Sequence, residues 1–384
     1  MKNSHDVNGV LNLYNTHAAK INAIHLANIY GTLARSVQMS NVTKLRNDDR
    51  FIQLLKTTND KLHSNPEKFG VRSIATVTHS LGKLKICDHQ FLNEIINNHE
   101  RIAKSGEPQA LSNICWAFAK LDFKADALFH SVAGQHVKIV RDGNVQAMSN
   151  ICWAFATVGH EAEDLFKAVA AQHGRFVRDG TAQAVANTLW SFAIAGYLDE
   201  GRDLVEKLWN RACDGRLQFN DENLRQLALF YASAQIEEPN LNLEPPPESL
   251  LGQIEAAAAK QGVTDSREQN LVSSTLKELN IDHKMEVSPF ESSNVTFNTF
   301  TMLNIDIVFS TKNKKKIAME FNGPSHYVQS KGIDFESGTT KFKRRLLGRL
   351  GYTVMSIYWD DWRRVSETGE TQAFLKNSRN FNRN

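Results

Sequence analysis

The chain has 384 residues, of which 41% are apolar, so two or three domains with sizeable cores are expected and global disorder is excluded. The formal net charge of +3 excludes a basic surface that covers the whole molecule, so any attraction for polyanions must be local. No apolar run is long enough to span a bilayer.

The first 20 residues lack the apolar core of a secretory signal and the arginine-rich pattern of an organelle transit peptide. The four cysteines do not have metal-binding spacings, and two of them lie inside apolar runs. Neither a disulfide scaffold nor a cysteine metal site is expected. An intracellular, reducing compartment fits this pattern.

The middle of the chain repeats with a period of 37 residues. Three segments share the pattern Gln-Ala-x-x-Asn-x-x-Trp-x-Phe-Ala; they cover residues 109–119, 146–156 and 183–193. A second helix is expected after each of them, over about 126–141, 163–178 and 202–212. A helix pair that recurs at a fixed period is the signature of an α-solenoid.

Weaker copies flank the three strong ones, near residues 25–33, 74–81 and 224–232. The array therefore covers residues 1–236 with about six helix pairs, and the atypical end units serve as caps. The repeated Trp and Phe lie on the apolar stripe of their helices, where each unit buries its face against the next, so they are expected in the core.

Basic residues recur near the end of the second helices. They are Lys138, Arg141, Arg175 and Arg178. Cations at a helix C-terminus interact favourably with the helix dipole, which alone explains them. Stacked along a solenoid, they would equally form a ladder for phosphates. Both interpretations stay open.

The repeat pattern resembles the octotricopeptide-like helical repeats of organelle RNA-binding proteins. That resemblance implies single-stranded RNA as the ligand, whereas the periodicity alone implies only a binding surface.

A Pro-rich linker and a closing helix are expected over residues 237–262. The last domain, 263–384, reads as a helix, three strands, a basic helix and a strand, which predicts a small α/β fold. Residues 311–364 hold 12 Lys and Arg against five Asp and Glu. This surplus fits either a polyanion partner or a solvated basic face. The phosphate-binding candidates are Lys343, Arg344, Arg345 and Arg349.

Two carboxylates stand on predicted strands beside the basic helix. Asp306 lies in the strand 303–309, and Glu320 ends the strand 316–321. Carboxylates in such a position, next to lysines, are able to hold a divalent metal ion or to work beside a phosphate chain.

Residues 304–362 resemble a RAP domain, on the evidence of Asp306, the segment 320–326, the basic helix 339–351 and the segment 359–362. RAP domains are similar to the PD-(D/E)XK restriction-endonuclease-like fold. The resemblance implies that Asp306 and Glu320 hold Mg²⁺ or Mn²⁺, with Glu268 as a further carboxylate.

One departure from the nuclease pattern concerns the lysine expected two residues after Glu320, which is Asn322 here. Lys341 or Lys343 from the basic helix would then have to supply the ammonium group. His326 is a candidate proton carrier or else a turn residue that packs or caps. The carboxylate pair is either a retained metal site or a vestigial one.

The predicted fold is mainly α, with an α-solenoid followed by a small α/β restriction-endonuclease-like domain. The expected function is RNA binding in the processing, stabilisation or maturation of specific RNAs, in mitochondria or plastids by resemblance. Two alternatives stay open. One is a metal-dependent endoribonuclease that uses Asp306 and Glu320, and the other is a structural component of an organelle ribosome. The expected partners are single-stranded RNA and ribonucleoprotein components, and no membrane is expected.

Overall fold

A computed structural model describes residues 7–260, 267–290, 303–311, 314–323, 326–330 and 333–377. It divides into two compact units, each considered by itself. The first unit is Met1–Ala184 with Gln329–Phe335, and the second is Val185–Val328 with Glu336–Asn384. In the part of the chain that is described, no helix is both long and apolar enough to cross a membrane.

The first unit is helical apart from its short share of a hairpin. Its helices are α1 (Val7–His17), α2 (Ala23–Ser36), α3 (Val42–Arg46), α4 (Asp49–Ser64), α5 (Val71–Lys83), α6 (His89–Asn97), α7 (His99–Ser105), α8 (Pro108–Lys120), α9 (Asp126–Ala133), α10 (His136–Asp142), α11 (Val145–Val158), α12 (Glu163–Ala170) and α13 (His173–Asp179), with short 3-10 turns after α1, α2 and α4. Helix α14 (Ala182–Ala195) follows, and the division between the units falls within it.

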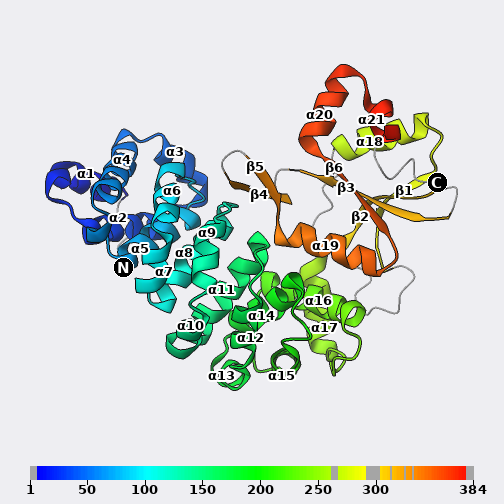
Figure 1. Cartoon of the computed structure of the whole chain (residues 1–384), viewed down its shortest axis with the longest axis horizontal. Helices are drawn as coiled ribbons and strands as arrows, with labels where there is room; N and C mark the ends of the chain where they lie inside the picture. The colour runs from blue at the N-terminus through cyan, green and yellow to red at the C-terminus, as the bar shows by residue number, and fades with distance from the viewer. Residues whose placement is uncertain are drawn as a thin grey trace. The chain divides into compact units, whose positions relative to one another are not determined.

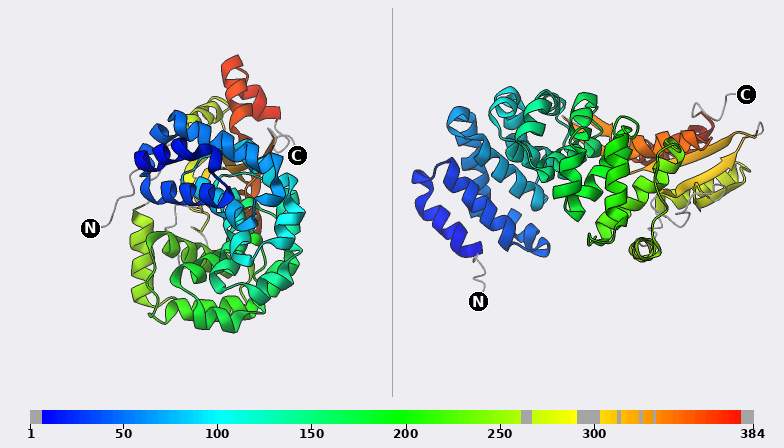
Figure 2. Two further views of the ribbon diagram at one scale, coloured as in Figure 1. Left: turned by 90° about the vertical axis from the view of Figure 1, so that its left-hand side faces the viewer. Right: turned by 90° about the horizontal axis from the view of Figure 1, so that it is seen from below.

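The first helices of successive repeats pack against one another in this unit, α2 on α5, α5 on α8 and α8 on α11 (Figures 1 and 2). Their apolar stripes meet there, so Phe118 and Phe155 are fully buried, as the periodicity predicts. Trp153 is also buried, whereas Trp116 is only half-buried. The ring of His79, which occupies the equivalent place one period earlier, lies 4.8 Å from the ring of Trp116.

Two of the three predicted second helices are divided in two, whereas the third, α15 (Arg202–Cys213), is a single helix close to its predicted span of 202–212. The span 126–141 is divided into α9 and α10, and 163–178 into α12 and α13. Both interruptions fall at the same place in the repeat, where the backbone N–H groups of Gln135 and Gln172 bond to carbonyls three residues back instead of four. A tight turn of this kind ends one helix and lets the next start in a new direction.

The second unit holds the last repeat helices and the α/β domain. Its helices after α14 are α15 (Arg202–Cys213), α16 (Asp221–Glu237), α17 (Glu248–Ala259), α18 (Arg267–Glu278), α19 (Gly338–Arg349), α20 (Trp359–Thr368) and α21 (Thr371–Asn377). Its main strands are β1 (His283–Val287), β2 (Ile305–Ser310), β3 (Lys316–Asn322) and β6 (Thr353–Tyr358). A two-stranded ladder joins β4 (Tyr327–Ser330) to β5 (Ile333–Glu336).

The four main strands form one sheet in the order β1-β2-β3-β6. The first three are antiparallel, and β3 pairs in parallel with β6 after the crossover through α19. The face with Ile307, Met319 and Ile357 packs under α18, α20 and α21, around the buried Trp362. The opposite face, with Ala318 and Val354, packs on Leu347 of α19 (Figure 1). The α-solenoid and small α/β domain predicted from the sequence are therefore both present.

Helix α19 also contacts α16, inside the second unit. The guanidinium of Arg345 bonds to the carboxylate of Glu237 and to the carbonyls of Ala193 and Ile194 at the end of α14. These contacts explain why the compact units divide within the repeats. The boundaries predicted from composition were 1–236, 237–262 and 263–384.

Candidate functional site

The two predicted carboxylates lie on neighbouring strands and on the same face of the sheet. Ile307 pairs with Met319 in the β2–β3 register, so one further step sets Asp306 opposite Glu320. The Oδ2 atom of Asp306 accepts a hydrogen bond of 2.7 Å from the backbone N–H of Phe321. Side chains alternate between the two faces along a strand, so Glu320 and Asn322 share the face that α19 covers.

Lys343 of α19 reaches this face. Its ammonium group lies 2.5 Å from Oε2 of Glu320 and 2.7 Å from the carbonyl oxygen of Asn304. The Glu320 side chain is only 6% exposed and that of Lys343 is 18% exposed. The nuclease pattern has a lysine at the position of Asn322. Here the ammonium group beside Glu320 comes instead from Lys343 of α19.

Burial controls the protonation of Glu320. Removal from water raises the pKa of its carboxyl group to about 7, with the charge of Lys343 acting against that rise and the nearby charge of Asp306 adding to it. The carboxylate form of Glu320 is therefore disfavoured by burial and depends on the ammonium group of Lys343 beside it.

Two buried polar atoms of β3 stand out. Within the described residues, neither Oε1 of Glu320 nor Nδ2 of Asn322 has a hydrogen-bond partner. Asn322 is almost fully buried, and both side chains line the same pocket. An unpaired buried polar group costs free energy, so an unpaired acceptor and an unpaired donor in the lining of one pocket indicate a place for a polar ligand.

His326 is tied to the start of α19. Its Nδ1 lies 3.4 Å from the hydroxyl of Thr340, and its carbonyl oxygen accepts a 3.0 Å bond from that hydroxyl. Burial, with the charge of Lys343, lowers the pKa of this imidazole, which favours its neutral form. The packing and capping role considered for His326 is therefore visible, and the side chain also borders the pocket.

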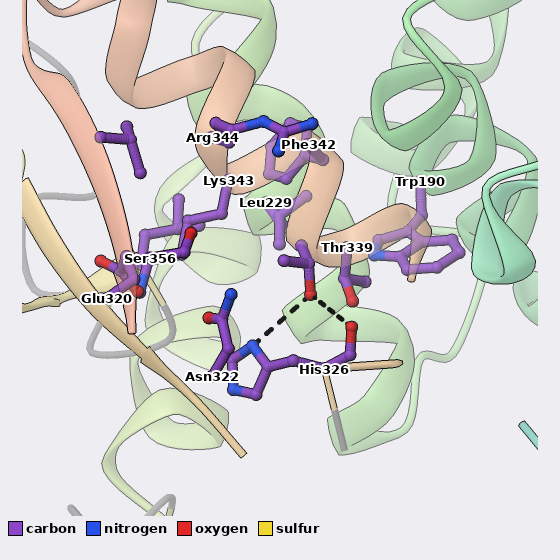
Figure 3. A pocket seen from close by; sticks show the side chains of 13 residues that line it. Trp190, Leu229, Glu320, Asn322, His326, Thr339, Phe342, Lys343, Arg344 and Ser356 are labelled. Atoms are coloured by element: carbon purple, nitrogen blue, oxygen red, sulfur yellow. Dashed lines mark hydrogen bonds and ion pairs between the residues drawn. The ribbon is translucent and has the colours of Figure 1, made fainter. Parts of the chain in front are cut away.

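The pocket lies between β3, β6, α19 and the last repeat helices, all within the second unit, and has a volume of about 250 Å³. In Figure 3, Glu320, Ser356 and Asn322 stand at one end and Trp190 at the other. Its walls are formed by Trp190, Leu229, Leu303, Glu320, Asn322, His326, Thr339, Thr340, Phe342, Lys343, Arg344, Val354 and Ser356.

The residues present do not fit a resident divalent metal ion. One oxygen of each carboxylate is already bonded, and an ammonium group sits against Glu320. In the stretches that the structure describes, no three His, Cys, Asp or Glu side chains come together as a metal-binding group. Glu268 on α18 therefore does not join Asp306 and Glu320 in such a group.

Comparison with known proteins gives two family matches. The model of the RAP domain matches residues 319–378. The model of the RNA-editing substrate-binding complex 6 protein matches residues 24–239, which is more than half of the chain. The chain belongs to this family. The predicted RAP domain is also confirmed, and these two matches indicate an RNA-associated protein.

A curated relative is the rice (Oryza sativa subsp. japonica) protein described as "RAP domain-containing protein, chloroplastic". It is 26% identical over 151 residues, which make up 39% of this chain and 21% of the rice protein. The chain therefore matches about a fifth of the length of this relative.

The cations of the RAP domain fall into two groups. Lys343 and Arg345 already have partners within the protein. Lys343 is paired with Glu320, and Arg345 is bonded to Glu237 and to two backbone carbonyls. Arg344 pairs with Glu336 but keeps half of its side chain exposed, and Arg349 is exposed at the end of α19. Lys341 lies half-buried on the same helix and is not part of the pocket wall.

The basic residues of the repeats divide in the same way. Lys138 donates to the carbonyls of Lys104 and Gly106, and Arg175 makes the corresponding bonds to Val140 and Gly143 one period later. Both fasten a repeat to the one before it.

The other two basic positions of the repeats face solvent. Arg141 and Arg178 each pair with the aspartate that follows them, and their side chains are 68% and 69% exposed. Of the four predicted positions, these two therefore keep a guanidinium at the surface.

Sequence reasoning missed the apolar part of the pocket. Trp190, Leu229 and Phe342 come from three helices that are far apart in the chain, and no spacing rule connects them. The replacement of the strand lysine by Asn322 was the one local signal, and it pointed to altered chemistry at the right place.

Proposed function

We propose that this protein binds single-stranded RNA in the processing, stabilisation or maturation of particular RNAs, within a ribonucleoprotein and without cutting the strand. The observation that carries the proposal is the closed arrangement at β3, where Lys343 neutralises Glu320 and Asn322 replaces the strand lysine. Membership of a family described as an RNA-editing substrate-binding complex protein supports RNA as the partner. The chloroplastic relative supports an organelle, a plastid or a mitochondrion, as the location.

The phosphate contacts of the RAP domain would come from Arg344 and Arg349, because both reach solvent on α19. In the repeats, Arg141 and Arg178 are exposed as well, and each would exchange a weak surface ion pair for a phosphate. Lys343, Arg345, Lys138 and Arg175 would instead hold the fold together. Binding through exposed arginines releases counterions, so affinity should fall steeply with salt.

The test is the affinity for a labelled single-stranded RNA over a series of salt concentrations. Arg344→Ala with Arg349→Ala should weaken binding to all sequences and lower the slope of log K against log salt by roughly 1.4, at about 0.7 per lost contact on a single strand. The matched control is Arg363→Ala with Arg364→Ala on α20, which covers the other face of the sheet. An unchanged slope in the α19 variant, or no saturable RNA binding by the natural protein, contradicts the proposal.

The second candidate is metal-dependent RNA cleavage. The observation in its favour is that Asp306, Glu320 and an ammonium group are adjacent on one face. The residues around them do not form a cation site by themselves. Incubation of the protein with labelled RNA and Mg²⁺ or Mn²⁺ separates the two candidates. Cleavage that disappears in both Asp306→Ala and Glu320→Ala would replace the first proposal, whereas binding with intact RNA removes the second.

A further inference from the structure

The pocket beside β3 has one polar end and largely apolar walls. Its polar end offers one acceptor, Oε1 of Glu320, and one donor, Nδ2 of Asn322, from alternate positions of the same strand. Neither has a partner among the described residues, although both side chains are more than nine-tenths buried. A ligand that satisfies both atoms must present a hydrogen-bond donor to Glu320 and an acceptor to Asn322.

The walls of the pocket are suited to a flat ring. Trp190 and Phe342 provide aromatic surfaces, and Leu229 adds an aliphatic one (Figure 3). The volume of about 250 Å³ is below the usual range for drug-sized ligands, so the pocket takes one small ring system. Aromatic side chains stack on nucleobases, whose faces are apolar and whose edges carry donors and acceptors in sequence.

The charges around the pocket argue against a phosphate inside it. The nearest buried cation, Lys343, is already neutralised by Glu320, and the same carboxylate would repel a second anion. Arg344, by contrast, borders the pocket with half of its side chain in water. A base inside and its phosphate outside, near Arg344, would satisfy both observations.

We propose that this pocket holds a single unpaired base of a bound RNA strand, with the hydrogen-bonding edge of the base on Glu320 and Asn322 and its ring against Trp190. The inference rests on the proposed RNA binding. It adds a site at which residues of the RAP domain and of the last repeat helices contact the same base. Since one donor and one acceptor fit a mixed edge of any of the four bases, ring size and the neighbouring walls would set the preference among them.

The experiment compares the natural protein with Asn322→Ala and Trp190→Phe, using short single-stranded RNAs that differ at one position, including one with an abasic site there. The natural protein should bind the abasic strand about tenfold more weakly than the strand that has a base at that position. In each variant the two strands should bind with nearly the same affinity. The salt slope should stay unchanged, because no phosphate contact is removed. Gln372→Ala, which removes an exposed amide on α21, is the matched control and should behave like the natural protein.

Two further measurements make the outcome decisive. Thermal unfolding is measured for both variants, because Asn322→Ala empties a fully buried position and should lower the midpoint somewhat through lost packing. If Asn322→Ala does not fold, the base preference of Trp190→Phe decides the test. Asn322→Asp, which exchanges the donor for an acceptor, should change the order of preference among bases.

The possible results separate the two proposals. Equal affinity of natural protein and variants for all strands overturns the base pocket but leaves RNA binding intact. Tighter binding of free nucleoside monophosphates than of the strand also overturns it, in favour of a small-molecule site. Absence of any RNA binding by the natural protein removes the proposed function itself.

Discussion

The repeats and the α19 helix use similar basic residues in similar ways. In the repeats, Lys138 and Arg175 bind carbonyls at the end of the preceding unit. On α19, Arg345 binds the carbonyls that end α14, together with Glu237. In both regions the cation closes an exposed helix end against its neighbour. The comparison teaches that the basic residues of a helix have to be sorted into buried and exposed ones before any of them is assigned to ligand binding.

The largest effect is expected from Arg345→Ala. The change leaves Glu237, whose side chain is 7% exposed, without its cation, and leaves two carbonyls without a donor. Losing one partner of a mostly buried ion pair costs about 3 kcal/mol of the free energy of unfolding. Chemical denaturation measures it, with the exposed Arg349→Ala as the control at less than about 0.5 kcal/mol. Equal stability of the two variants would refute the structural role of Arg345.

A pH series on Glu320→Gln probes the polar end of the pocket. The folded pKa of Glu320 is raised to about 7 from an ordinary value of 4.5, so the unfolded chain releases this proton first as pH rises. The natural protein should therefore lose stability relative to Glu320→Gln between about pH 4.5 and 7 and level off above that, by roughly 3 kcal/mol. Unfolding midpoints at matched pH measure the difference, and a rise over this range would contradict the burial of the charge.

Arg175→Ala tests the corresponding role in the repeats. It removes the bonds to the carbonyls of Val140 and Gly143 and should cost about 2 kcal/mol of unfolding free energy. Arg178→Ala, three residues further on and 69% exposed, should cost less than about 0.5 kcal/mol. RNA affinity should respond in the opposite order. A variant of Arg175 that folds normally but loses RNA binding would return this residue to the phosphate contacts.

The smallest effect is expected from Gly82→Ala in α5. A Cβ atom there would meet Cα and Cβ of Ala117 at 3.0 Å and the ring of Trp116 at 3.3 Å. Overpacking should outweigh the better helix propensity of alanine and leave a net loss of about 1 kcal/mol. Gly174→Ala, with nothing within 4 Å of the added atom, is the control and should be neutral or stabilising. A gain of stability in Gly82→Ala would mean that α5 and α8 yield more easily than their packing indicates.

The sequence predicted what depends on local periodicity. Period 37 fixed the repeat helices and their buried Phe118 and Phe155, and the motif at Glu320 led to the RAP domain. The strand order places Asp306 opposite Glu320 as expected, and one of the two candidate lysines, Lys343, contacts Glu320.

What the sequence could not supply depends on tertiary contact. The carbonyl partners of Lys138 and Arg175 and the position of Trp190 in the pocket wall arise when segments distant in the sequence meet. Trp190 shows the limit best. It follows the same pattern as Trp153 and is equally buried, yet it borders the pocket of the α/β domain.

The bonds from Arg345 to Glu237 and to the end of α14 have a consequence for how the chain can be shortened or rearranged. A fragment that started after α16 (Asp221–Glu237) would keep every strand of the sheet but would lose all the acceptors of Arg345, which are Glu237 and the carbonyls of Ala193 and Ile194. The smallest fragment that folds by itself should therefore include α14 to α16 together with the RAP domain, so the last repeats and this domain should behave as one folding unit.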